Sequence, residues 1–144
     1  MMLYLDSSAL VKCYGEEAGA LDTVDVIDGA EMVAASPITR VEVSSALARA
    51  VREGVLAPKT GREAYESFRD EWRSLIQVPL TERVLVRAQE LVWESGLRAY
   101  DALQLASALV WQERVAQDVT LATFHHRLAA AAVGARLRTW PPAT

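Results

Sequence analysis

The sequence of 144 residues is poor in cysteine and has no long apolar run. Its one cysteine, Cys13, cannot form an intrachain disulfide, and this usage is typical of a reducing cytoplasm. No apolar stretch approaches the roughly 18 residues that would suggest a membrane span. The first residues lack a basic segment followed by a signal-type apolar stretch. We therefore expect a cytoplasmic protein with no membrane association.

An excess of basic residues is also missing. Lysine and arginine number 15 against 19 acidic residues, so the formal net charge is −4. Proteins that bind nucleic acid are usually basic, and this counts mildly against such a partner. Carboxylates gathered around a metal ion would lower the net charge without excluding a phosphate substrate. No Ser-His-Asp set or Cys-His pair stands out as a competing nucleophile.

The chain reads as one domain, residues 1–144, because no linker, repeat or low-complexity tract divides it. Apolar runs predict strands at 3–5, 32–35, 76–79, 119–122 and 137–140. Helical spacing predicts a first helix that ends near residue 12. It predicts further helices at 18–27, 37–53, 58–72, 84–95, 100–111 and 124–132. Alternating strands and helices favour an α/β fold, a parallel sheet with helices on both faces. Sites in such sheets lie beyond the carboxyl ends of the strands.

Three acids have positions that suit such a site. Asp6 directly follows the first strand, where it either faces the site or caps the next helix, a role that Ser7 or Ser8 could also take. Asp101 lies at the start of an apolar helix, where the helix dipole favours an acid in any case. Glu42 lies near the start of another helix, where an exposed glutamate is common.

The order of three short motifs is more specific than any one acid. Residues 5–12 read LDSSALVK, residues 38–43 read ITRVEV, and residues 98–106 read RAYDALQLA. In series, these strings resemble the motifs of PIN-domain ribonucleases. The resemblance covers essentially the whole chain and is strongest to the toxins of the VapBC toxin–antitoxin class.

This resemblance implies a three-layer αβα sandwich and an endoribonuclease that depends on Mg²⁺ or Mn²⁺. It assigns Asp6, Glu42 and Asp101 to the catalytic metal site, with the Ser8 hydroxyl close by. Mg²⁺ prefers carboxylate oxygens, waters and phosphate oxygens, so the residue types agree with this assignment. The resemblance also implies an RNA substrate, a homodimer and a small antitoxin protein that covers the active-site groove.

One family position is altered. The family usually has a fourth acid in a Thr-x-Asp-like motif, and in the corresponding stretch here, Thr123 is followed by Phe124 and His125. Either the site works with three acids, or His125 joins it, and an imidazole suits Mn²⁺ or Zn²⁺ better than Mg²⁺. The simpler interpretation, which we favour from the sequence alone, is that His125 caps the last helix and faces solvent.

Other interpretations stay open. Lys12, Arg40 and Arg98 lie beside the motifs and could contact RNA phosphates, although a solvated surface role explains each one as well. Haloacid-dehalogenase-like phosphatases also have an aspartate after the first strand, and they have a second acid two residues later. Here that second position is Ser8, which counts against this class. The change at His125 is also compatible with a PIN-like scaffold that binds RNA or a protein without cleavage.

Overall fold

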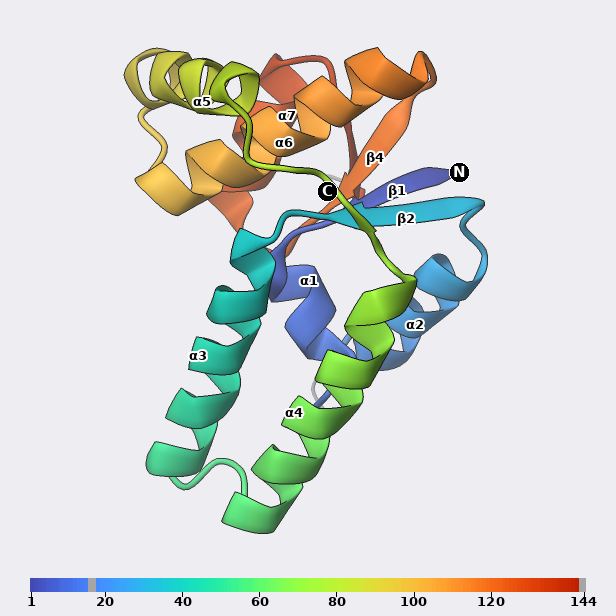
Figure 1. Cartoon of the computed structure of the whole chain (residues 1–144), viewed down its shortest axis with the longest axis vertical. Helices are drawn as coiled ribbons and strands as arrows, with labels where there is room; N and C mark the ends of the chain where they lie inside the picture. The colour runs from blue at the N-terminus through green and yellow to red at the C-terminus, as the bar shows by residue number, and fades with distance from the viewer. Residues whose placement is uncertain (16–17, 143–144) are drawn as a thin grey trace.

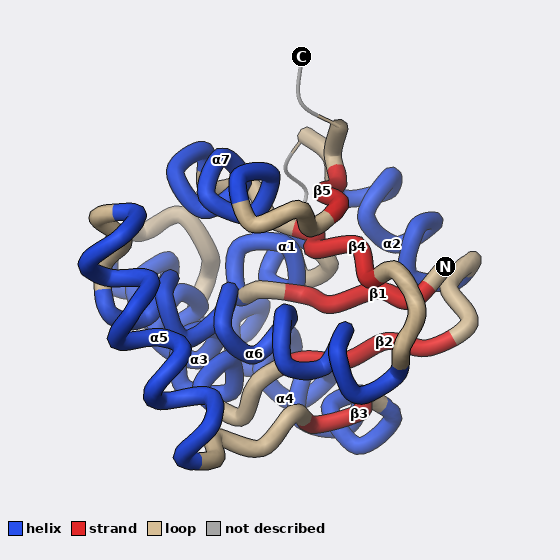
Figure 2. The backbone as a smooth tube through the Cα atoms, turned by 90° about the horizontal axis from the view of Figure 1, so that it is seen from above, coloured by secondary structure: helices blue, strands red, loops and turns tan. Residues whose placement is uncertain are grey.

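The computed structural model describes residues 1–15 and 18–142. Within these residues, five parallel strands form one sheet in the order β3-β2-β1-β4-β5 (Figure 2). The strands are β1 (Met2–Leu5), β2 (Met32–Ala35), β3 (Ile76–Gln77), β4 (Val119–Ala122) and β5 (Arg138–Trp140). Because all of them run in the same direction, their carboxyl ends meet at one edge of the sheet.

Helices cover both faces of this sheet, with α1 to α4 on one side and α5 to α7 on the other (Figure 1). The predicted three-layer αβα sandwich is therefore confirmed. The helices are α1 (Ser7–Lys12), α2 (Ala20–Asp28), α3 (Ile38–Arg52), α4 (Pro58–Glu71), the short 3₁₀ helix η1 (Trp72–Ser74), α5 (Glu82–Ser95), α6 (Ala99–Val115) and α7 (His126–Gly134).

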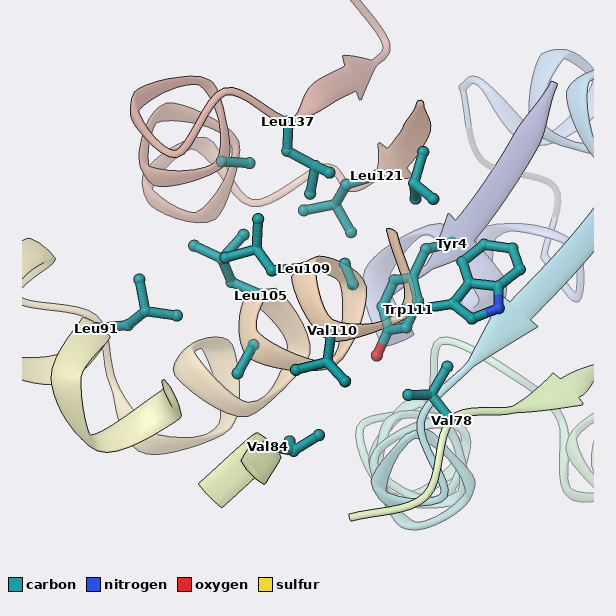
Figure 3. Packing of buried hydrophobic residues seen from close by; sticks show 14 of the residues in the cluster. Tyr4, Val78, Val84, Leu91, Leu105, Leu109, Val110, Trp111, Leu121 and Leu137 are labelled. Carbon is teal, nitrogen blue, oxygen red and sulfur yellow. The ribbon is translucent and has the colours of Figure 1, made fainter. Parts of the chain in front are cut away.

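The central strand β1 is buried on both of its faces. Its residues alternate between the two layers, as strand geometry requires. Tyr4 packs in one apolar cluster with α5, α6 and α7, and Figure 3 shows it there together with Leu105 of α6. Leu3 and Leu5 pack in the other cluster, with α1, α3 and α4. The strand is thus fixed in place, and so is the start of the loop that follows it.

Helix α6 and strand β3 differ in length from the sequence prediction. Helix α6 continues to Val115 instead of ending at residue 111, because the three polar residues after Trp111 are good helix formers. Strand β3 covers Ile76–Gln77 and stops before Pro79, which has no N–H for the ladder. In the described part of the chain, no helix combines the length and apolar character that crossing a membrane requires.

A close approach between α3 and α4 occurs at Gly61. A β-carbon built there would lie 2.3 Å from Cγ2 of Val51. We expect Gly61→Ala to lower the free energy of unfolding by about 1 kcal/mol, because overpacking costs more than the improved helix propensity returns. Urea denaturation measures this change.

The matched control is Gly134→Ala in α7, where an added β-carbon meets no atom within 4 Å. This control should not lose stability. Val51→Ala should remove the penalty of Gly61→Ala in the double variant. Equal stability of Gly61→Ala and the wild-type protein would contradict the predicted clash.

Candidate active site

Asp6 is the first residue after β1 and also the N-cap of α1. Its Oδ1 accepts hydrogen bonds from the backbone N–H of Ala9 at 2.9 Å and from the hydroxyl of Ser8 at 2.8 Å. Its Oδ2 accepts a hydrogen bond from the hydroxyl of Thr123 at 2.6 Å. The residue is 1% exposed. Asp6 therefore caps the helix itself, in place of Ser7 or Ser8, and also holds a buried carboxylate at the carboxyl end of the sheet.

Burial raises the pKa of Asp6, because the carboxylate loses its water shell. The hydrogen bonds from Thr123, Ala9 and Ser8 act in the opposite direction and lower this pKa, as does the nearby His125. The charged carboxylate is thus held by fixed donors in a place where water solvates it poorly. Such a group gains from a bound cation.

The hydroxyls of Ser8 and Thr123 join the loop after β4 to the start of α1. Ser8 Oγ accepts a hydrogen bond from the backbone N–H of Phe124 at 2.9 Å, and Thr123 Oγ1 accepts one from that of His125 at 3.1 Å. The backbone at His125 is extended, so α7 begins at His126 and not at 124 as the apolar pattern predicts. The hydroxyls of Ser8 and Thr123 both lie at the buried aspartate.

Glu42 projects from the second turn of α3 and is half-buried. Its Oε1 accepts a hydrogen bond from Nε2 of Gln104 at 2.8 Å. Burial raises the pKa of Glu42, the Gln104 hydrogen bond lowers it, and the charges of Asp6 and Asp101 raise it further. The three predicted acids are therefore close enough to repel one another.

His125 contacts the acidic residues directly. Its Nδ1 lies 3.4 Å from Oδ1 of Asp101 and 3.9 Å from Oδ2 of Asp6. The hydrogen bond with Asp101 raises the pKa of His125, and its partial burial opposes that shift. The side chain makes no capping hydrogen bond to α7. His125 occupies the N-cap position of α7 as predicted, and its side chain is 49% exposed, but the same side chain also contacts the acids.

Two of the three predicted cationic residues pack against aromatic rings, and the third, Arg98, is exposed. Nζ of Lys12 lies 4.9 Å from the ring centroid of Phe124, in the loop that leads from β4 to His125. The guanidinium of Arg40 lies 6.0 Å from the ring centroid of Trp72, and Arg40 itself is exposed. Lys12 and Arg40 both lie between Asp6 and Glu42 in the sequence, and their side chains remain candidates for contacts with RNA phosphates.

The motif-based prediction of the site did not include Gln104, although its third motif contains this residue. Gln104 follows Asp101 by three residues, so the two side chains share one face of α6. It is a buried polar residue in a helix that is otherwise apolar over this stretch. This combination of buried polarity and spacing is the signal that would have identified it.

The donor types at this site fit a hard divalent cation. Among residues 1–15 and 18–142, no three His, Cys, Asp or Glu side chains are arranged as a ready set of metal ligands. Mg²⁺, however, is usually held by one or two protein carboxylates, with waters and phosphate oxygens completing its octahedron. The repulsion that Asp6 and Asp101 exert on Glu42 shows excess negative charge, which a cation would neutralise.

Comparison with known proteins agrees with this geometry. Residues 3–134 match the family model described as PIN domain. The chain belongs to the PIN-domain family. The family that the three motifs predicted is thereby confirmed, and the alternative of a haloacid-dehalogenase-like phosphatase is not supported.

The relatives of this PIN domain include two curated proteins of Mycobacterium tuberculosis. They are named Ribonuclease VapC45, in strain CDC 1551, and Ribonuclease VapC49, in strain H37Rv. Each is 34% identical over 108 residues, which are 75% of this chain and 75% of the relative.

Solved structures share the PIN fold at lower identity. A toxin–antitoxin complex from Klebsiella pneumoniae has a TM-score of 0.66 at 18% identity and covers 90% of this chain and 91% of its own. PAE2754 from Pyrobaculum aerophilum has a TM-score of 0.68 at 21% identity, covering 96% and 83%. FitAcB from Neisseria gonorrhoeae has a TM-score of 0.66 at 18% identity, covering 98% of each chain.

Proposed function

We propose that this PIN domain is a metal-dependent endoribonuclease, the toxin of a toxin–antitoxin pair, which hydrolyses phosphodiester bonds in RNA. One observation carries the proposal. Asp6, Glu42 and Asp101 come from three separate elements, and the charges of Asp6 and Asp101 raise the pKa of Glu42, which supports a shared site at the carboxyl end of the parallel sheet. The names of the VapC relatives support RNA as the substrate.

The proposed cofactor is Mg²⁺ or Mn²⁺, held by oxygens of Asp6, Asp101 and Glu42. A divalent ion at such a site lowers the pKa of a water molecule and neutralises charge on the scissile phosphate. Asp6 supplies a carboxylate that does not move, because three donors fix it. Asp101 is more open to solvent, with a side chain 23% exposed, and would face the incoming RNA.

His125 occupies the fourth corner of the proposed site. A neutral imidazole nitrogen is a better ligand for Mn²⁺ than for Mg²⁺. Its contacts with Asp101 and Asp6 support a role in the site, with a preference for Mn²⁺ over Mg²⁺ as the consequence. The same replacement is the observation that favours the second candidate, a PIN-like scaffold that binds RNA or a protein without cleavage.

The proposed protein partners are a cognate antitoxin and a second copy of the chain. Solved relatives of this fold include toxin–antitoxin complexes, which supports the first. Large apolar side chains on the outer face of α5 support a protein–protein contact, because isolated domains rarely leave such a group uncovered. These exposed residues are Leu85, Val86, Val92 and Trp93.

Cleavage of RNA by the purified protein tests the proposal. We expect cleavage with Mn²⁺ and, more weakly, with Mg²⁺, and none with EDTA. Asp101→Asn should reduce the rate roughly tenfold, since solvent can replace part of a ligand that is partly exposed. The matched control is Asp118→Asn, an exposed acid at the start of β4 that pairs with Arg138, and it should cleave like the wild type.

Two outcomes would decide against this function. Cleavage that persists both with EDTA and in Asp101→Asn would exclude the metal site as its source. Binding of RNA without cleavage, in the presence of Mn²⁺, would favour the scaffold.

A further inference from the structure

Gln104 lies inside the protein at the junction of three elements. It is 1% exposed and projects from the second turn of α6. Its amide contacts Tyr4 of β1, and on the other side it contacts Thr39 and Glu42 of α3. A single side chain thus connects the buried central strand to an acid of the proposed metal site.

The direction of these hydrogen bonds is fixed. The Tyr4 hydroxyl donates to Oε1 of Gln104 at 2.7 Å. Because a carboxylate only accepts hydrogen bonds, the amide turns its NH₂ toward Glu42 and α3. The two N–H groups donate to Thr39 Oγ1 and to Glu42 Oε1, both at 2.8 Å. Glu42 therefore always meets a donor and never the amide oxygen.

We propose that Gln104 is a positioning residue for Glu42. Its amide N–H donates to one carboxylate oxygen of Glu42 and so keeps the charged group directed at the metal site. This role rests on the proposed function in one respect, namely that the site containing Glu42 binds a metal ion. The Gln104 N–H that donates to Oε1 of Glu42 at 2.8 Å keeps this side chain in place before a cation arrives. Tyr4 acts indirectly, because its hydroxyl donates to the amide oxygen of Gln104 and helps to orient the amide.

Other residue types would not perform this role. A glutamate at position 104 would bring a fourth negative charge against Glu42. An apolar residue of similar size would remove the Gln104 donor from Glu42, and the side chain would be less restrained against turning away from the acids that repel it. Only a neutral amide accepts from Tyr4 and donates twice on its opposite side.

The test is a double-mutant cycle with Mn²⁺ affinity as the readout, measured by calorimetry on the full chain. The variants are Gln104→Met, Glu42→Gln and the two combined. We expect Gln104→Met to weaken Mn²⁺ binding about tenfold, as loss of a residue that orients a ligand commonly does. Because Gln104 acts through Glu42, the double variant should be no weaker than Glu42→Gln alone.

A matched control separates positioning from general support of the fold. Gln112 lies two turns further along α6, and its Oε1 accepts a hydrogen bond from the backbone of Val119, at the opposite end of β4 from the site. Gln112→Met should lower the melting temperature and leave Mn²⁺ affinity unchanged. Tyr4→Phe is a milder variant should Gln104→Met fold poorly, and it should weaken Mn²⁺ binding by a smaller factor.

The outcomes are distinct. Losses that multiply in the double variant, or an unchanged Mn²⁺ affinity in both Gln104→Met and Tyr4→Phe, would overturn the positioning role. A wild-type protein that binds Mn²⁺ but does not cleave RNA would overturn the proposed function alone, and the cycle would still report on Gln104. A wild-type protein that binds no Mn²⁺ would overturn both.

Discussion

Asp6→Asn should reduce metal-dependent RNA cleavage by about three orders of magnitude. A metal ion commonly supplies several kcal/mol of charge stabilisation in the transition state, and about 4 kcal/mol corresponds to roughly a thousandfold in rate. Asp6 is the acid that the protein holds most firmly, and its neutral amide analogue would bind a cation poorly. Single-turnover cleavage of an RNA oligonucleotide with Mn²⁺ measures the loss.

The fold should tolerate this change well. Asparagine is as good an N-cap as aspartate, so its amide oxygen can keep the hydrogen bond to the backbone of Ala9. The amide nitrogen would meet Thr123 Oγ1, whose proton can turn to Ser8 Oγ, 3.4 Å away. Removing a buried charge also removes its desolvation cost, so the metal-free variant should melt at or above the wild-type temperature.

Asp6→Ala is the informative comparison, because it removes the cap together with the carboxylate. It should lose cleavage to the same extent as Asp6→Asn and lose about 1 kcal/mol of stability in addition. Wild-type cleavage by Asp6→Asn would mean that Asp6 is a helix cap with no part in the reaction. A large loss of stability in Asp6→Asn would mean that its activity cannot be interpreted.

His125→Asp should increase Mg²⁺-dependent cleavage by ten- to a hundredfold. The histidine nitrogen already lies near Asp101 and Asp6. A carboxylate at this position would replace an imidazole, which Mg²⁺ binds weakly, with an oxygen ligand that Mg²⁺ prefers. The preference for Mn²⁺ should fall at the same time. Parallel rate measurements in the two metals give both effects.

The neighbouring His126→Asp serves as the control for added charge. His126 is exposed, and it is the first residue of α7. A similar gain from His126→Asp would indicate a general electrostatic effect. Unchanged cleavage and unchanged Mg²⁺ affinity in His125→Asp would place position 125 outside the site, whatever its contacts with Asp101.

The sequence alone was sufficient for the fold, because strand and helix patterns are local signals, and the series of motifs predicted the acids of the site. Asp6 follows a short apolar strand, and Asp101 lies three residues into an apolar helix, so the chain order and the parallel sheet place them at one edge. Their separation in the sequence matters little once β1 and the neighbouring strands are parallel.

The orientation of His125 and the role of Gln104 depend on contacts between distant segments, which periodicity does not report. The imidazole lies beside Asp101 at the surface, and Thr123 accepts a hydrogen bond from the backbone of His125 in the loop after β4. Gln104 is surrounded by Tyr4, Thr39 and Glu42, which come from elements up to 100 residues away. A polar residue in an apolar helix could be flagged from the sequence, but its partners could not be named.

The hydrogen bond between Asp6 and Thr123 joins residues that are 117 positions apart. Strand β1 is synthesised well before its neighbour β4, which begins only at Val119. Until β4 and the loop after it are made, Asp6 lacks its hydrogen bond from Thr123, and β1 lacks one of its two neighbouring strands. A partly synthesised chain would therefore be harmless to the RNA around it, and the hazard would begin only when the domain is nearly complete.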